Sequence, residues 1–362
     1  MTWARESVSS AVRPLTSRAR PLLMLVSALC AAALVVIPAS SEYWGYVGAR
    51  ALFYVLEALS LVVLVGWGGQ VSLMHGAYVG LGAFGTSFLA ERHGVPRELA
   101  IPLAAAAGVA LGSLAGLPAL RLSGLQFAIA SLVFSGATAQ WLLQRPELPQ
   151  FLPRGELFGI DMLSSGNLYL VMLVVTAVVY VGMWNLRRST FGALLIACRH
   201  APAMVDDCGV DSRRARMWAF ALASFIATLG GALYGLLVTG FSADAFGIQL
   251  SISLLLYTVI GGTESLAGPI IAGALFGVVP ELLLGRTGAQ ASAWPDVVSG
   301  IVVVALVALA PSGLASLRTR RRRPRERLGA MASVGWGRFE SALADRAPAE
   351  VGRRASETVG RR

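Results

Sequence analysis

The chain contains a series of long apolar runs, and this feature constrains its fold more than any other. A helix needs about 20 mostly apolar residues to cross about 30 Å of hydrocarbon. The chain is 56% hydrophobic and only 14% charged, whereas soluble domains carry about 25% charged residues. The sequence therefore predicts an all-α polytopic membrane protein with about ten transmembrane helices. The ten runs lie near residues 22–37, 46–65, 71–90, 99–117, 123–143, 167–186, 217–239, 247–262, 266–285 and 295–314.

The first run, at residues 22–37, also resembles the apolar part of a secretory signal. Four Arg residues precede it, and Ala39, Ser40 and Ser41 follow it. Its 16 residues exceed the usual length of about 7 to 15 for such a segment. We therefore expect it to be retained as the first span.

The net charge of +10 is concentrated in three segments. Residues 1–20 carry +3, residues 187–216 carry +3 and residues 318–362 carry +8. Basic residues gather in cytoplasmic segments of membrane proteins, and an even number of apolar runs separates each pair of neighbouring segments. We therefore expect all three segments, and thus both termini, to be cytoplasmic.

This charge pattern divides the chain into three parts. We expect a basic cytoplasmic N-terminus at 1–21, a transmembrane domain at 22–315 and an Arg-rich cytoplasmic tail at 316–362 that is disordered. The tail would be attracted to anionic membrane lipids. Its aromatic residues, Trp336 and Phe339, are too few for a nucleic-acid site.

All 30 basic residues are Arg, which excludes several kinds of chemistry. A Walker A phosphate loop needs a Lys, and a Schiff-base enzyme needs an amine nucleophile. The three Cys and three His residues do not show metal-ligand spacing. We expect a protein that is not an enzyme and has no catalytic residue, metal site or cofactor, so that any ATP would be bound by other subunits.

Glycines within the apolar runs predict close helix packing. The string from Gly80 to Gly85 fits the dinucleotide fingerprint G-x-G-x-x-G, but it lies inside a helical run and not between a strand and a helix. Small residues four positions apart, such as Gly231 with Gly235, let membrane helices approach each other closely.

One short segment occurs twice. Residues 68–73 (GGQVSL) recur as residues 261–266 (GGTESL), and a glycine-rich run follows each copy. The pattern suggests an internal two-fold repeat, although chance similarity is an alternative in a chain this rich in Gly. The runs at 247–262 and 266–285 are short or interrupted, so we expect broken or re-entrant helices there. In transporters, interrupted helices between repeats often line the substrate path.

Polar groups inside apolar runs are the candidates for such a path, because burying them in lipid is costly. The ionisable ones are Glu57, His75, Glu264 and Glu281, and each could equally be satisfied by its neighbours at a helix end. Our hypothesis for a translocation path comprises four residues near the repeated segments: Gln70, Ser72, His75 and Ser265.

The loop at residues 187–216 has a helical pattern of its own. Apolar residues at positions 191, 194, 195 and 198 fit one face of a short helix. Gly209 would permit the left-handed turn that ends a second helix. An amphipathic helical pair is more typical of a docking element than of a simple connection, which usually has only a few residues.

This loop, together with three further blocks, resembles the LivM-type permease subunits of bacterial branched-chain amino-acid ABC importers. The likeness runs from about residue 46 to 315, with the blocks in the family's order. Two departures are His200-Ala201-Pro202, where the family commonly carries an acidic-polar-acidic stretch, and Met74 in place of a usual Gly. The three blocks are residues 66–77 (GWGGQVSLMHGA), 121–130 (RLSGLQFAIA) and 260–269 (IGGTESLAGP).

The resemblance implies a permease in the bacterial inner membrane. It would work with a second, LivH-like permease, two cytoplasmic ATPase subunits and an extracytoplasmic substrate-binding protein. ATP binding on the partner subunits would move the loop and alternate access to the path. The residues similar to the family's ATPase-coupling loop are Arg199, His200, Asp206, Asp207, Gly209 and Val210.

The cargo and the energy source leave alternatives open. Branched-chain or related small amino acids suit a path with few fixed charges, and so do urea or short amides. A secondary transporter or channel that works without ATP is the alternative from another class, and it predicts a denser set of buried carboxylates than this chain carries.

Overall fold

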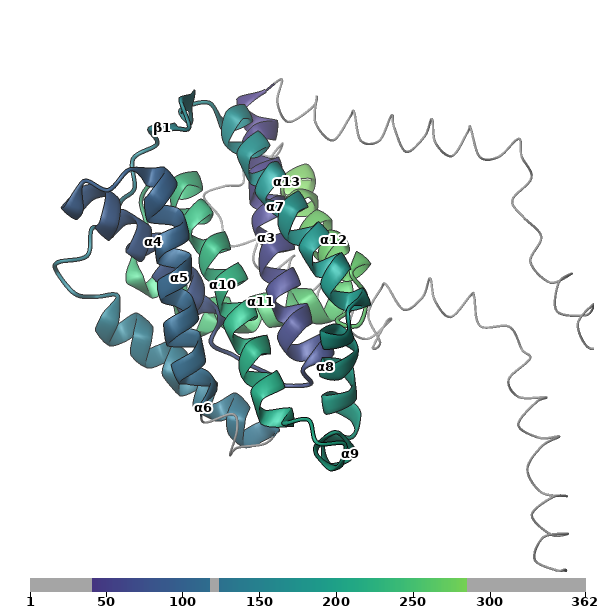
Figure 1. The fold of residues 1–362 in the computed structure, drawn as a ribbon. Helices are drawn as coiled ribbons and strands as arrows, with labels where there is room; N and C mark the ends of the chain where they lie inside the picture. The colour runs from purple at the N-terminus through teal and green to yellow at the C-terminus, as the bar shows by residue number, and fades with distance from the viewer. Residues whose placement is uncertain (1–40, 118–123, 285–362) are drawn as a thin grey trace, which may run out of the picture. The chain divides into compact units, whose positions relative to one another are not determined.

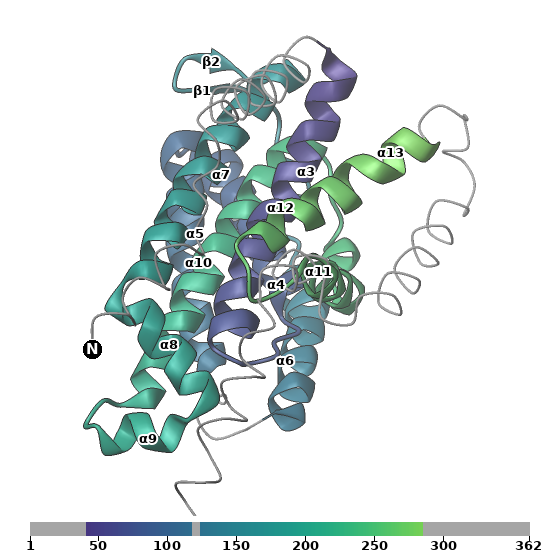
Figure 2. The same ribbon diagram turned by 90° about the vertical axis from the view of Figure 1, so that its right-hand side faces the viewer.

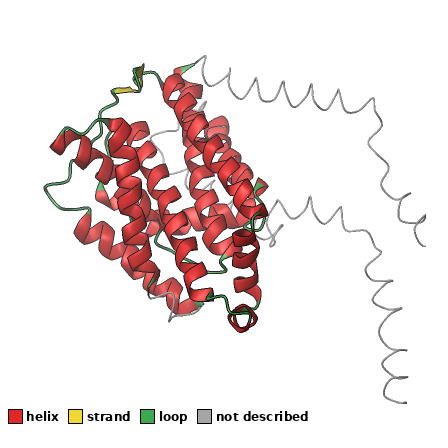
Figure 3. Ribbon diagram, in the orientation of Figure 1, coloured by secondary structure: helices red, strands yellow, loops and turns green. Residues whose placement is uncertain are grey.

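The computed structural model describes residues 41–117 and 124–284, which are mostly helical (Figures 1 and 3). A two-stranded antiparallel hairpin, β1 (Glu156–Leu157) with β2 (Ile160–Asp161), precedes α7. The apolar runs at 22–37 and 295–314, the basic N-terminus and the Arg-rich tail lie outside the described residues. The expectations for them stay predictions, as do the count of ten spans and the two-fold repeat.

The helical elements are, in chain order, α3 (Glu42–Leu61), η1 (Val62–Trp67), α4 (His75–Ser87), η2 (Phe88–Arg92), α5 (Arg97–Gly116), α6 (Leu125–Ala137), η4 (Thr138–Leu142), α7 (Ser165–Arg188), α8 (Thr190–His200), α9 (Pro202–Asp207), α10 (Ser212–Val238), η5 (Ala243–Phe246), α11 (Ile248–Gly261), α12 (Ala267–Gly273), η6 (Ala274–Val278) and α13 (Val279–Leu284). Four of these, η1, η2, η4 and η6, are π-helical turns that continue the α-helix before them.

Five helices in the described part of the chain are long and apolar enough to cross a membrane. This number of candidate spans is typical of a multi-pass membrane protein. The five segments are Glu42–Trp67, Arg97–Leu114, Ser165–Arg188, Ser212–Val238 and Ala243–Gly261.

Two helices form the centre of the helical bundle. α10 packs most extensively against α4 and α5, and α3 packs against α7, α10 and α12. The segments Glu42–Trp67 and Ser212–Val238 are also the most buried of the five candidate spans, whereas only a third of each of the other three is buried. The buried positions of α10 carry many small residues, which explains how its neighbours approach it so closely.

Glycines make the close approach of α4 and α10 possible. A methyl group added at Gly231 would overlap the carbonyl oxygen of Val79, and one added at Gly82 would overlap the carbonyl oxygen of Thr228. The backbones of the two helices are therefore in direct contact, as the glycine spacing predicts.

The helix expected over residues 71–90 begins later than predicted. Gly69 has a φ of +68° and ends the preceding helix, with the Gln70 N–H donating to the Leu64 carbonyl oxygen at 3.0 Å. Backbone without regular structure then continues to Met74, and α4 begins at His75. The apolar pattern alone did not reveal this break, because Val71 and Leu73 extend the run.

A second interruption separates α11 from α12, as the sequence predicts. α11 has 14 residues and ends at Gly261, after which Gly262 has a φ of +111°. α11 is seen close to end-on in Figure 2, where α3 and α10 run up the page. It therefore lies across the direction of these helices, and it contacts α3, α4, α6 and α12.

Candidate functional site

The loop at residues 187–216 folds into the predicted helical pair. α8 follows α7 directly, and the Ser189 hydroxyl caps its first turn by accepting a hydrogen bond from the Gly192 N–H at 3.3 Å. Leu195 and Cys198 are buried on the face that the apolar spacing indicated. Gly209 follows α9 with a φ of +81°, so the left-handed turn is confirmed.

Acidic side chains hold the second half of this loop in place. The Asp206 carboxylate accepts hydrogen bonds from the backbone N–H of Ser212 at 2.9 Å and from its hydroxyl at 3.1 Å. These bonds hold the pKa of Asp206 below its usual value. Asp211 caps α10 by accepting from the N–H groups of Arg213 and Arg214.

The other coupling-loop candidates face solvent. His200, Asp207, Gly209 and Val210 are all exposed in this structure. They form part of a surface around α8 and α9 that a partner protein could contact. Asp206 is exposed as well, but its hydrogen bonds to Ser212 give it a role within the loop.

Arg199 is the coupling-loop candidate that points inward. We call residues 66–70 the first glycine loop and residues 261–265 the second glycine loop. Arg199 donates from Nη1 to the carbonyl oxygen of Gly66 in the first loop, and its Nη2 lies 3.5 Å from Oε1 of Glu264 in the second. One side chain thus connects α8 with both glycine loops.

The two glycine loops also contact each other. A methyl group added at Gly66 would overlap the carbonyl oxygen of Thr263, so the two backbones touch at this point. The two copies of the repeated sequence are therefore neighbours in space, although 193 residues separate them in the chain.

A small polar cavity lies beside Arg199. Its volume is about 140 Å³, and it is lined by residues of the first glycine loop, α6, α8 and α10. Gln70 and Arg216 both line it, and neither Gln70 Oε1 nor Arg216 Nε has a hydrogen-bond partner among the described residues. The cavity can therefore hold water or a polar group.

The four predicted path residues do not meet at one place. Gln70 lines the polar cavity, and Ser265 accepts a hydrogen bond from the Ala267 N–H at 3.2 Å where α12 begins. Ser72 and His75 are fully buried. The structure thus places Gln70 and Ser265 in the adjoining glycine loops, whereas Ser72 and His75 are enclosed by helices.

His75 has a defined partner inside the bundle. Its Nε2 lies 2.8 Å from the Ser60 hydroxyl, and that hydroxyl donates its single hydrogen to the Ala223 carbonyl oxygen at 2.8 Å. Nε2 must therefore be the donor, which fixes the tautomer of a neutral His75. This chain of bonds connects α4, α3 and α10.

The remaining ionisable candidates have different surroundings. Glu281 pairs with Arg50 at 2.6 Å, and Glu264 pairs with Arg199. Glu57 is fully buried against Gly230, and its carboxylate oxygens have no hydrogen-bond partner among the described residues.

Sequence reasoning missed a group of serines at the start of α4. The Ser131 hydroxyl accepts from the Leu73 N–H at 2.9 Å, and the Ser251 hydroxyl accepts from the Gly76 N–H at 2.9 Å. Ser135 and Ser251 lie 3.0 Å apart, oxygen to oxygen. Ser251 thus satisfies an N–H group that the first turn of a helix leaves without a partner, and Ser131 satisfies one in the segment just before it.

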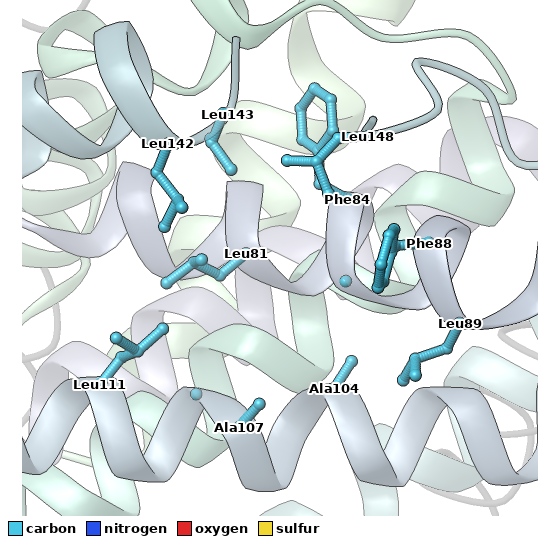
Figure 4. Close-up of a pocket in the computed structure, with 12 residues that line it drawn as sticks. Leu81, Phe84, Phe88, Leu89, Ala104, Ala107, Leu111, Leu142, Leu143 and Leu148 are labelled. Carbon is cyan, nitrogen blue, oxygen red and sulfur yellow. The ribbon is translucent and has the colours of Figure 1, made fainter. Parts of the chain in front are cut away.

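A larger cavity of about 250 Å³ lies between α4, α5 and η4 (Figure 4). Leucine, phenylalanine and small side chains line it, and none of its lining residues is charged. In Figure 4, Leu81 of α4, Leu111 of α5 and Leu142 of η4 come from three sides of it. Its lining suits an aliphatic group.

Residues 45–307 match the sequence profile of a family described as branched-chain amino acid transport system / permease component. The chain belongs to this family. The match covers the whole described structure except its first four residues, and it includes α8, α9 and both glycine loops.

The individual relatives are named as permease proteins of transport systems. The chain is 26% identical to the high-affinity branched-chain amino acid transport system permease protein LivM of Escherichia coli, over 64% of this chain and 61% of LivM. It is 25% identical to the inner membrane ABC transporter permease protein YjfF of Escherichia coli, over 74% of this chain and 86% of YjfF. It is also 25% identical to the autoinducer 2 import system permease protein LsrC of an Enterobacter strain, over 75% of this chain and 79% of LsrC. No solved structure matches the chain.

Proposed function

We propose that this chain is the permease subunit of an ATP-binding-cassette importer in a bacterial inner membrane. The observation that carries the proposal is the position of residues 187–216. His200, Asp207 and Val210 are exposed in this segment, and Arg199 of the same segment reaches both glycine loops. A motor subunit that moved this segment would therefore act directly on the ends of helices in the bundle.

The proposed assembly contains this chain, a second LivH-like permease, two ATPase subunits and an extracytoplasmic binding protein. ATP would be bound by the ATPase subunits, since the chain has no Lys for a Walker A loop. Both termini and residues 187–216 would lie in the cytoplasm.

The proposed cargo is a branched-chain or related small amino acid. LivM is named for branched-chain amino acid transport, whereas LsrC is named for autoinducer 2 import, so the family's cargo varies between members. The proposed route passes the two glycine loops. Gln70 and Ser265 would line it, and Ser72 and His75 would become accessible as the bundle opens.

The test is transport by the complete assembly in proteoliposomes. We expect uptake of leucine, isoleucine or valine that requires ATP, the ATPase subunits and the binding protein, and we expect the isolated chain to hydrolyse no ATP. Urea and acetamide as competing solutes would distinguish an amide importer. Ion-driven uptake by the chain alone, without ATPase subunits, would overturn the proposal in favour of a secondary transporter or channel.

A further inference from the structure

Arg199 occupies the one place in the described structure where α8 and both glycine loops meet. We infer that Arg199 is a positioning residue, which transmits movement of the helical pair α8–α9 to the two glycine loops together. This inference rests on the proposed function, because it concerns how ATPase movement reaches the bundle.

The planar guanidinium group is suited to this role. Nη1 of Arg199 donates to the Gly66 carbonyl oxygen, and Nη2 of the same group faces the Glu264 carboxylate at 3.5 Å. The two nitrogens are held in a rigid fork, so one group can contact both partners at once in a defined geometry. A Lys has a single ammonium group on a flexible stem and cannot impose the same geometry.

Gly69 permits the side chain to approach. A Cβ atom at this position would lie 2.6 Å from Arg199 Cγ, and the φ of +68° also favours glycine. The aliphatic stem of Arg199 therefore rests on the backbone of the first glycine loop while its head reaches past it. This contact adds a steric constraint to the two polar ones.

The two glycine loops are packed backbone to backbone at Gly66 and Thr263, so a displacement of one loop presses on the other. The first loop connects η1 to α4, and the second connects α11 to α12. A displacement of Arg199 is thus applied to the ends of four helical elements. Two of these, α4 and α12, begin immediately after an interruption, where a change of direction requires the fewest broken hydrogen bonds.

The residue that follows Arg199 in the chain is exposed to solvent. His200 is exposed, whereas the Arg199 side chain is largely covered, with 29% of its surface exposed. The outer side of α8 is therefore free to contact a motor subunit while Arg199 contacts the bundle.

The experiment compares Arg199→Ala, Arg199→Lys and Glu264→Gln in the complete assembly, with ATP hydrolysis and cargo uptake measured on the same proteoliposomes. For Arg199→Ala we expect an assembly of normal composition in which the cargo taken up per ATP hydrolysed falls by at least about fivefold. Arg199→Lys should show an intermediate loss. Glu264→Gln should show the smallest, since the Glu264 side chain is 77% exposed and its ion pair is weak.

Arg214→Ala is the matched control. Arg214 lies in the same segment, its side chain is 85% exposed, and its ion pair is with Asp211 of the same segment. We expect its cargo-to-ATP ratio to be that of the wild type. An unchanged ratio in Arg199→Ala, with hydrolysis and uptake reduced equally, would overturn the inference, as would an equal loss of the ratio in Arg214→Ala.

Hydrogen exchange provides a readout that does not depend on transport. Three backbone N–H groups report on the loops, those of Gly68, Gln70 and Gly262, which donate to carbonyl oxygens of the preceding helices. In the wild-type assembly their exchange should change together when ATP binds. In Arg199→Lys, which is the variant more certain to fold, the changes should be smaller or no longer coincide. Coincident changes of wild-type size in this variant would refute the role of Arg199 even if the wild type imports cargo as proposed.

If the wild-type assembly transports without ATP, the proposed function fails, and the inference about Arg199 fails with it. ATP-dependent uptake by the wild type, combined with an unchanged ratio in Arg199→Ala, would leave the proposed function intact and refute only the role of Arg199.

Discussion

Asp206 shows how one exposed carboxylate can order a surface loop. It accepts two hydrogen bonds from Ser212, the first residue of α10, and so ties the end of α9 to the start of α10. The carboxylate must be charged to accept both bonds, which is why its pKa lies below the usual value near 3.8. The group therefore stabilises the loop above its ordinary pKa, and this contribution is lost as the pH falls through the lowered pKa.

We predict a matching pH dependence for the protection of residues 201–212. Hydrogen exchange in the full chain, divided by the intrinsic rate at each pH, should show protection that decreases as the pH falls below about 4. Asp206→Asn should have low protection that hardly depends on pH. Asp207→Asn is the control, because Asp207 is an exposed neighbour, and it should behave as the wild type. Wild-type protection in Asp206→Asn would show that these hydrogen bonds do not order the loop.

At the scale of elements, the contact between α4 and α10 depends on glycine. Gly231→Ala would place a methyl group against the Val79 carbonyl oxygen of α4, where the clash is with backbone and cannot be relieved by a rotamer change. We predict a loss of stability of about 1–3 kcal/mol, as for other overpacked cores. The measurement is the midpoint of thermal unfolding of the full chain in detergent, followed by circular dichroism.

Gly182→Ala in α7 is the control for this prediction. Gly182 is also inside a long helix, but it is exposed, and an added Cβ would meet no atom within 4 Å. Because alanine favours helix by up to about 1 kcal/mol over glycine, this variant should be as stable as the wild type or slightly more so. Equal destabilisation in both variants would mean that the close contact between α4 and α10 is not the cause.

The elements that could be predicted are those set by local patterns. The apolar face of α8 and the left-handed turn at Gly209 follow from the residues of one short segment. The start of α4 could not be predicted, because the groups that satisfy its first turn are distant in the chain. Ser131 is 58 residues from Leu73, and Ser251 is 175 residues from Gly76.

In the candidate site, too, only the features with a local sequence pattern could be predicted. The repeated glycine segments and the docking loop were found separately, since each has a local signature. Their meeting through Arg199 depends on tertiary packing, which no spacing rule encodes. The contact between His75 and Ser60 could not be predicted for the same reason, because the two residues lie on different helices. The role of His75 in a path stays a prediction.

At the scale of the whole molecule, the orientation in the membrane decides whether the proposed function is feasible. α7 has 24 residues, so it is about 36 Å long and can cross about 30 Å of hydrocarbon. The hairpin that contains Phe158 precedes α7, and the helical pair α8–α9 follows it. We therefore predict that these two regions lie on opposite sides of the membrane.

The chain's own cysteines allow the orientation to be measured. Cys208 is exposed beside Gly209, whereas Cys198 is buried and its thiol pKa is raised by that burial, so it should react slowly. In a Cys30→Ser background, a membrane-impermeant maleimide should label Cys208 in inverted vesicles and not in intact cells. Phe158→Cys, placed at a residue that is 74% exposed and combined with Cys208→Ser, should show the opposite pattern. Labelling of Cys208 in intact cells would place α8 and α9 outside, where ATP-driven subunits cannot reach them, and both the proposed function and the role of Arg199 would then be wrong.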